Sequence, residues 1–570
     1  MKKNIKFLML FGAMVLMFSP SCSDEFLEVA PTGSLGSVEL SSQAGLEGSL
    51  ISSYAMLLGR NGFYSDASNW FWGSVLGGDA NKGTNAGDQS QVNEIQAYSA
   101  QTINSSVLEK YATTYEGIAR ANATLGLVAI ASTVSESVKT RITAEARFLR
   151  GHYYFDLKKN FDDTPYVDET WNGVDPVGNA ADLWPSIEAD LKFAFDNLPG
   201  TQADAGRANK WAAGALYGKA LLFQGKFGEA RTVLNDVIEN GVTAKGEAYA
   251  LLPNYADAFR STSDNSSESV FAAQAAAGTG DINNANPGMV LNFPHGGGDR
   301  PGGCCGFFQP SFELANSYRT DDDGLPLLDG SYNDAGNELI TDMGLASTDP
   351  FTLDGGNVDP RLDHAIGRRG VPYLDWGDHP GRDWIRDQPY GGPYSPKKFI
   401  YYKGGIGTEN DGSSWTPGYT AVNYNIIRYA DVLLMAAEAE IESGNIQPGI
   451  DLINQVRTRA NNSRIQNGGD DAANYNVGTY GTIGSIDEAR TILRFERKLE
   501  LSGEGHRKYD LVRWGVAAEN LNAYLAYEAP KLNAPFQGAA FTANNDEYLP
   551  IPQNEIDLLG AGVLIQNPGY

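Results

Sequence analysis

Cysteine is nearly absent from this 570-residue chain, which contains only Cys22, Cys304 and Cys305. A framework of disulfides therefore cannot hold the fold together. With 42% apolar and 11% aromatic residues, the chain can instead bury a large core, in one large domain or in several ordinary ones. For the adjacent pair Cys304 and Cys305, in a glycine-rich stretch, we expect two small buried thiols, with a strained bridge as the alternative.

Positive charge is also scarce, since 43 basic residues face 70 acidic ones and the formal net charge is −27. No cluster of lysine or arginine follows the first six residues. Nucleic acids and other anionic polymers need cations that replace their counterions, so they are disfavoured as partners. Neutral or cationic ligands fit this composition better.

Long hydrophobic runs are missing except at the start of the chain. An apolar run from Phe7 to Phe18 follows the basic start and is typical of a secretory signal, which we assign to residues 1–21. The sequence Ser19-Pro20-Ser21-Cys22 then resembles a bacterial lipobox, in which the cysteine is acylated and becomes the new N-terminus. Several acyl chains would give stable membrane anchoring. Ser19 is a weak match to the usual aliphatic residue, so ordinary cleavage with a free or lost cysteine remains the alternative.

Conventional catalytic motifs are absent. The sequence contains no P-loop, no His-Glu-x-x-His and no Gly-x-Ser-x-Gly. The acidic stretch Asp321 to Gly324 lacks the flanking ligands of an EF-hand and is interpreted as a solvated turn. His152 lies on an apolar helix face and is interpreted as a core residue. We therefore predict no catalytic residue, no metal and no cofactor, although a glycosidase carboxylate pair cannot be chosen among 70 acids.

Helical patterns occupy roughly residues 40–240 and 425–525. Two segments share a helix-turn-helix signature centred on Gly225 and Gly444, 219 residues apart, which indicates tetratricopeptide-like units. A further apolar stripe surrounds Phe148 and Tyr153, and Ser485 stands three residues before Glu488 as in a capping box. The predicted fold class is mainly α, a tetratricopeptide-like helical scaffold that carries a loop-rich lobe.

The lobe is predicted at residues 278–423, where Gly, Pro, Asp and aromatic residues replace the helical period. Helical regions 22–277 and 424–570 flank it. Binding sites concentrate on such loops when a rigid scaffold holds them.

Aromatic residues among polar ones mark two candidate binding segments. Sugar rings stack one apolar face on an aromatic ring and need polar partners for their hydroxyls. The alternative for each tryptophan is that it caps the core beneath a long loop. The candidates are Tyr64, Trp70, Trp72, Asp79 and Asn81 in the first segment, and Tyr373, Trp376, Trp384, Arg386 and Tyr390, with Tyr394 close by, in the second.

Several long motifs, in order, resemble the SusD/RagB family of Bacteroidetes surface lipoproteins. They are "CSDEFLEVAPTG", "YEGIARANATL", "EARFLRGHYYFDLKKNFDDTPYV", "NYNIIRYADVLLMAAEAEIESGN", "ERKLELSGEGHRKYDLVRWG" and the terminal "YLPIPQNEIDLL" with "LIQNPGY". The resemblance covers nearly all of the mature chain. Most of these motifs fall on predicted helices, so we interpret Arg494, Glu496, Arg497 and Arg507 as structural charges.

The resemblance implies a non-enzymatic, lipid-anchored protein on the outer face of the outer membrane. Such a protein captures oligosaccharide or polysaccharide and sits as a lid on a SusC-like TonB-dependent transporter. It also implies that the regions of Trp70 and Trp72, and of Trp376 and Trp384, hold the sugar. A peptide or glycoprotein cargo and, from another class, a glycoside hydrolase remain as alternatives.

Overall fold

Helices dominate the part of the chain that the computed structural model describes, residues 36–60, 62–296, 299–560 and 562–570. The prediction of a mainly helical fold is confirmed. The predicted signal peptide and Cys22 lie outside the described residues. Among those that are described, no helix has both the length and the apolar character that crossing a bilayer requires.

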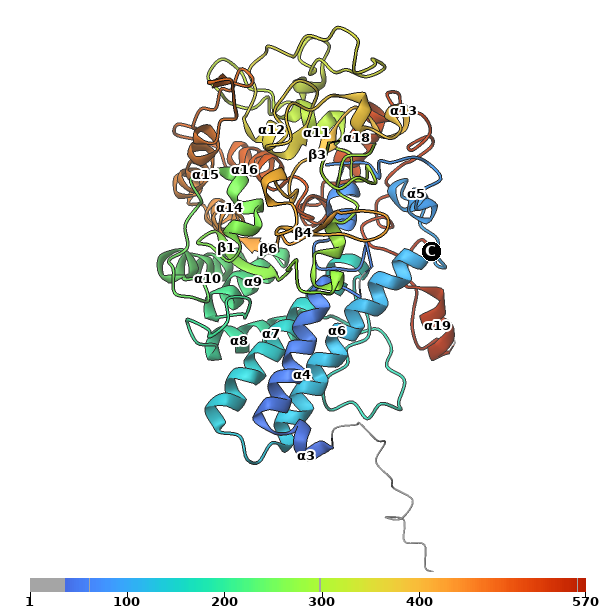
Figure 1. The fold of residues 1–570 in the computed structure, drawn as a ribbon. Coiled ribbons are helices and arrows are strands. Elements are labelled where there is room, and N and C mark those ends of the chain that lie inside the picture. Colours follow the sequence, from blue (N-terminus) through green and yellow to red (C-terminus); the bar gives the residue numbers. More distant parts are fainter. Residues whose placement is uncertain (1–35, 61, 297–298, 561) are drawn as a thin grey trace, which may run out of the picture.

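The long helices form one continuous series in which each packs on the next (Figure 1). Long helices that follow one another in sequence are also neighbours in space through the first half of the chain. α10 then packs directly on α14 although the whole lobe separates them in sequence. The series runs through α4 (Gln43–Ala55), α6 (Ser105–Ile130), α7 (Glu136–Phe161), α8 (Trp184–Asn197), α9 (Lys210–Phe223), α10 (Phe227–Asn240), α14 (Tyr429–Glu442), α15 (Ile446–Asn462) and α16 (Ile486–Leu501).

Both predicted helix-turn-helix units are present, as the pairs α9–α10 and α14–α15. Gly225 and Gly444 end the first helix of each pair at φ values of +70° and +87°, a conformation that side chains other than glycine rarely adopt. The predicted cap at α16 is also present, because the Ser485 hydroxyl accepts a hydrogen bond from the Glu488 backbone N–H. His152 is buried in α7, and burial lowers its pKa to about 3, as expected for a neutral core histidine.

Glycine also sets the spacing within the second pair. A Cβ added at Gly449 would lie 2.6 Å from Ile441 Cγ1 and 2.8 Å from the Ala437 carbonyl oxygen. We expect Gly449→Ala to lower the free energy of unfolding by about 1–3 kcal/mol, because the helices must separate or the side chain must shift. Gly126→Ala in α6 is the matched control; with nothing within 4 Å of the added Cβ, it should raise stability by about 0.5–1 kcal/mol. Urea unfolding measures both, and equal effects would contradict this packing argument.

The lobe leaves and rejoins the scaffold at one place. β1 (Ser269–Ala273) pairs antiparallel with β6 (Tyr424–Arg428), with Ala273 opposite Tyr424. Between them the chain forms the loop-rich mass at the top of Figure 1. Its regular elements are short: α11 (Phe312–Ser317), α12 (Arg361–Ala365), α13 (Gln388–Gly391), and the pairs β2 (Ile366–Gly367) with β3 (Ser395–Pro396) and β4 (Asn410–Asp411) with β5 (Tyr419–Thr420).

The remaining elements lie near the two ends of the described chain and after α15. The backbone N–H of Leu549 donates to the Asn160 carbonyl at 2.7 Å, which ties the C-terminal segment to the end of α7. These elements are α3 (Ser37–Leu40), α5 (Asn93–Gln96), the hairpin β7 (Gln466–Asn467) with β8 (Asp470–Asp471), α17 (Arg507–Arg513), α18 (Ala517–Glu528) and α19 (Gln553–Leu559).

Candidate functional site

The aromatic residues predicted in the first segment lie in the core. The Trp72 indole N–H donates to the Tyr64 carbonyl at 2.5 Å, and both side chains are buried. Trp70 stacks on Phe308, with ring centroids 4.9 Å apart and an angle of 17° between the planes. The structure therefore places these rings against other protein side chains, as in the alternative interpretation of a cap beneath a loop.

The two polar residues of that segment join it to distant parts of the chain. Asp79 accepts a hydrogen bond from the Gly503 N–H at 3.0 Å, and burial raises its pKa to about 6. The Asn81 amide donates to the Gly391 carbonyl at 3.0 Å. Both side chains are buried, so they hold backbone segments together.

The second segment forms a small core of its own inside the lobe. Tyr373 and Trp384 meet edge to face with centroids 5.3 Å apart, and Trp376 donates from its indole N–H to the Tyr401 carbonyl at 3.1 Å. The buried Tyr390 hydroxyl donates to Asn93 Oδ1 at 2.9 Å, and Tyr394 is buried as well.

Arg386 differs from the other predicted residues because it is exposed. Its guanidinium donates to Thr84 Oγ1 at 2.9 Å and pairs with Asp88. Together with the bond between Asn81 and Gly391, this contact shows that the structure brings the two predicted segments side by side.

An exposed aromatic surface lies elsewhere, at the hairpin of β4 and β5. Trp415 has 43% of its surface exposed, and its ring contacts Phe63 and Tyr419 edge to face with centroids 6.1 and 6.0 Å away. We call these three residues the aromatic platform. The sequence "GSSWTPGY" around Trp415 also places aromatic residues among polar ones. Sequence reasoning did not select it, because the two predicted segments contain more aromatic residues.

A disulfide loop adjoins the hairpin. A disulfide joins Cys304 and Cys305, so the expectation of two free thiols is wrong; glycines on both sides leave the backbone free to bring the sulfurs together. The Thr416 hydroxyl donates to the Gly302 carbonyl, and a Cβ at Gly303 would lie 3.3 Å from Pro417 Cδ. The hairpin and this loop therefore form one continuous surface.

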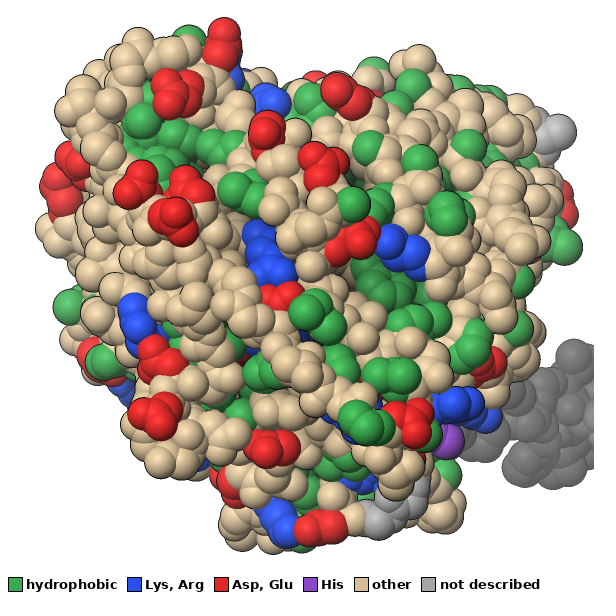
Figure 2. All heavy atoms as spheres, turned by 90° about the horizontal axis from the view of Figure 1, so that it is seen from above, with side chains coloured by type: hydrophobic (Ala, Val, Ile, Leu, Met, Phe, Trp, Pro, Cys, Tyr) green, Lys and Arg blue, Asp and Glu red, His purple; other side chains and the backbone are tan. Residues whose placement is uncertain are grey.

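A buried arginine stabilises that loop. Arg300 is only 9% exposed, and its Nη2 atom donates to the Gly303 carbonyl at 3.1 Å, while its buried Nε and Nη1 atoms have no hydrogen-bond partner. His295 lies nearby, and burial together with Arg386 and Arg300 lowers its pKa. Seen from the lobe side, hydrophobic side chains lie in hollows with acidic and basic side chains around them (Figure 2). An exposed aromatic surface bordered by polar side chains suits a polyhydroxylated ligand.

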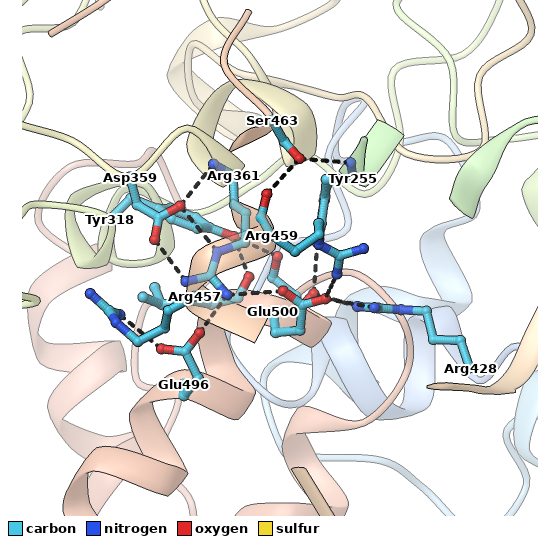
Figure 3. Close-up of polar contacts among 12 residues, drawn as sticks. Tyr255, Tyr318, Asp359, Arg361, Arg428, Arg457, Arg459, Ser463, Glu496 and Glu500 are labelled. Atoms are coloured by element: carbon cyan, nitrogen blue, oxygen red, sulfur yellow. Dashed lines mark hydrogen bonds and ion pairs between the residues drawn. The ribbon is translucent and has the colours of Figure 1, made fainter. Parts of the chain in front are cut away.

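The densest group of buried charges joins lobe and scaffold (Figure 3). Glu500 in α16 pairs with Arg361 of α12, Arg428 of β6 and Arg459 of α15. Burial alone would raise the pKa of Glu500, but these arginines outweigh it and hold that pKa well below its usual range. We call this the arginine–glutamate cluster, whose other members are Asp359, Arg457 and Glu496.

No group of three or more His, Cys, Asp or Glu side chains in the described ranges is placed to hold a metal ion. At the acidic turn, Asp321 Oδ1 instead accepts hydrogen bonds from the N–H groups of Asp323 and Leu325. These contacts fit the interpretation of that stretch as a solvated turn.

Comparison with known proteins identifies the scaffold. A profile described as "SusD family" matches residues 267–570, more than half of the chain. The chain belongs to the SusD family. A second profile, described as "Starch-binding associating with outer membrane", matches residues 25–222.

SusD-like relatives resemble the chain along most of its length. A SusD-like protein of Formosa agariphila is 25% identical over 527 residues, which is 88% of each chain. The structure of a SusD superfamily protein from Bacteroides vulgatus superimposes with a TM-score of 0.68 at 22% identity, covering 93% of this chain and 99% of the other. A structure titled "Laminarin binding SusD-like protein" is 26% identical, with a TM-score of 0.65 over 92% of this chain and 99% of that one. The tetratricopeptide-like description of the scaffold fits this fold.

Proposed function

We propose that this SusD-family protein binds oligosaccharides on the aromatic platform and passes them, chemically unchanged, to a SusC-like TonB-dependent transporter. The observation that carries the proposal is Trp415, an exposed tryptophan on the lobe whose ring has two aromatic neighbours. A sugar can stack on such rings while its hydroxyls accept hydrogen bonds.

The names of related proteins support a glycan as ligand. One solved relative is titled as laminarin-binding, and another is a surface glycan-binding protein of Bacteroides thetaiotaomicron in complex with laminarihexaose. The second profile is described as starch-binding. These ligands are neutral glucans, which agrees with the scarcity of positive charge in this chain.

The residues predicted from sequence take a supporting role in this proposal. Nine of the ten are buried, so in this conformation their rings and amides pack the loops on which the ligand rests. Arg386 is the exception and is proposed to contact the ligand beside Arg300. The lobe, residues 278–423, thus remains the proposed binding region.

The proposed cellular place is the outer face of the outer membrane, through lipid on Cys22. The lipobox-like sequence at residues 19–22 and the profile description "associating with outer membrane" support this location. The transporter partner is inferred from the family resemblance. Labelling with an alkyne palmitate tests the anchor: the parent protein should be labelled and Cys22→Ala should not. In addition, globomycin, which inhibits the lipoprotein signal peptidase, should change the electrophoretic mobility of the parent protein.

The proposal is non-catalytic. Incubation with the bound glycan should therefore release no new reducing ends with time. A steady rise in reducing ends that is proportional to protein would favour the hydrolase instead.

Calorimetric titration of a form beginning at Ser23 against neutral oligosaccharides and peptides tests the binding site. We expect Trp415→Ala to weaken binding of the preferred glycan by about fivefold, since a stacking contact contributes roughly 1 kcal/mol and the exposed indole is the centre of the platform. Trp171→Ala is the matched control, because Trp171 is 46% exposed but lies in a groove beside α6. Equal glycan affinities of the two variants would refute the aromatic platform as the binding site. If only peptides release or absorb heat on titration, the cargo is a peptide.

A further inference from the structure

Two arginines of the "RFERKLELSGEGHRKYD" motif lack the partners expected of structural charges. Glu496 pairs with Arg361 and Arg457, and Arg497 pairs with Asp431 and Asp510, so the structural interpretation holds for these two. Arg494 and Arg507 form no ion pair and no side-chain hydrogen bond within the described residues. Both side chains are partly exposed, so their guanidinium groups can meet solvent or a ligand.

Both arginines line one cavity of about 460 Å³ between α16, α17 and α18. The Arg494 guanidinium lies 5.2 Å from the ring of Trp514, and Trp514 is itself fixed by a hydrogen bond of its N–H to Glu438 at 2.8 Å. Phe495, Leu511 and Leu328 supply apolar wall. The volume is in the range of small-molecule sites, and the lining is more polar than apolar.

Acidic and basic side chains balance in the cavity lining. Lys498 and Glu313 pair with each other at 2.6 Å. The other acids of the lining, Asp329 and Glu519, are exposed. Arg507 interacts electrostatically with Asp79 and Glu313, and Arg494 with Glu438 and Glu442, but neither arginine forms a direct ion pair. Among the basic groups of the lining, these two guanidinium groups are therefore the ones that a ligand can pair with.

Tyr524 forms part of the cavity wall. It is 5% exposed, and its buried hydroxyl has no hydrogen-bond partner among the described residues. Because the hydroxyl has almost no accessible surface, the part of Tyr524 that meets the cavity is its ring.

Two glycines, Gly77 and Gly78, form part of the wall of this cavity. A Cβ at Gly77 would lie 2.6 Å from Arg507 Cβ, and one at Gly78 would lie 3.2 Å from the Tyr524 ring. Any larger residue there would press on the arginine and the tyrosine. The absence of side chains at these positions keeps both groups in place at the cavity wall.

We propose that this cavity binds a small organic oxyanion, a carboxylate or a phosphate, whose charged end lies between Arg494 and Arg507. The planar guanidinium presents paired donors that match both carboxylate and phosphate oxygens. The apolar part of the ligand covers Phe495 and Leu511. This site is separate from the aromatic platform and does not depend on the glycan proposal.

Calorimetry and thermal unfolding at constant ionic strength test the site on the chain from Ser23 to Tyr570. The probes are benzoate, phenyl phosphate and glucuronate, with benzyl alcohol and glucose as neutral counterparts. At least one anion should bind saturably and raise the melting temperature, while its neutral counterpart does neither. Comparing the affinity for phenyl phosphate with the affinities for benzoate and glucuronate shows whether the site prefers a phosphate or a carboxylate.

The variant Arg494→Gln/Arg507→Gln should weaken anion binding at least tenfold. Arg382→Gln removes an exposed charge in the lobe and should leave binding unchanged. If the double variant folds poorly, either single arginine variant tests the site, with a smaller expected loss of affinity for the anion. The proposal is overturned if no anion binds, or if anions bind the arginine variants as tightly as the parent protein.

Discussion

Replacing Glu500 by glutamine is expected to lower the free energy of unfolding by about 3–5 kcal/mol, because three buried arginines lose one shared carboxylate. The contacts are Arg428 Nη1 to Glu500 Oε1 at 2.6 Å, Arg361 Nη1 to Oε2 at 2.9 Å, and Arg459 to Oε1. An amide keeps the shape and one acceptor but carries no charge. It also places an NH₂ group against a guanidinium.

Urea unfolding followed by circular dichroism measures this effect. Glu136→Gln is the matched control: Glu136 forms a pair with Lys139 at the surface and its side chain is 87% exposed, so its loss should change stability by less than about 0.5 kcal/mol. If Glu500→Gln does not accumulate as folded protein, Arg459→Lys keeps the charge and tests the same cluster more gently. A Glu500→Gln variant as stable as the control would show that the cluster contributes nothing beyond packing.

Replacing Glu528 by glutamine is expected to change how stability depends on pH. Glu528 is fully buried in α18; Oε1 accepts a hydrogen bond from the Glu313 N–H at 2.7 Å, while Oε2 has no partner. Burial, with Glu313 nearby, raises the pKa of Glu528 to about 8. The folded protein therefore holds this proton at pH values where the unfolded chain, with an ordinary pKa near 4.3, has released it.

A raised folded pKa makes stability fall as the pH rises. Between about pH 4.5 and 8 the folded state binds one more proton than the unfolded state, so the free energy of unfolding decreases over this range, and the contribution is lost above pH 8. Glutamine is permanently neutral and removes this slope. We expect Glu528→Gln to match the parent protein near pH 5 and to exceed its stability by on the order of 3 kcal/mol at pH 8.

Urea unfolding at pH 5, 6, 7 and 8 gives the slope directly. The variant Glu239→Gln, at an exposed position of α10, should leave the slope of the parent protein unchanged. Parallel curves for Glu528→Gln and the parent protein would mean that the carboxyl group is ionised within the fold.

The helical part of the structure could be predicted because its signals are local. Glycine at 225 and 444, small residues at helix contacts and the serine cap at 485 each report a backbone requirement that the sequence states directly. The same holds for the break in helical period at the lobe. These features do not depend on how distant segments meet.

The binding surface could be predicted only in part, because an aromatic residue in a polar loop looks the same whether its ring faces solvent or core. Trp384 and Trp415 stand in similar surroundings in the sequence, but Tyr373 and His379 cover the first while the second is exposed on a hairpin. Burial of this kind is decided by contacts between distant residues. Likewise, Arg497 and Arg507 have the same chemistry in one motif, and only the fold gives partners to one and a cavity to the other.

The pairing of β1 with β6 has a consequence for how such proteins diversify. Because Ala273 lies opposite Tyr424, the 150-residue excursion between them begins and ends at neighbouring points, and α10 meets α14 without its help. Insertions or deletions within the excursion that spare the ion pairs of Arg361 with Glu496 and Glu500 leave the helix contacts beneath it intact. One helical frame can therefore carry loops of different length and sequence at its rim.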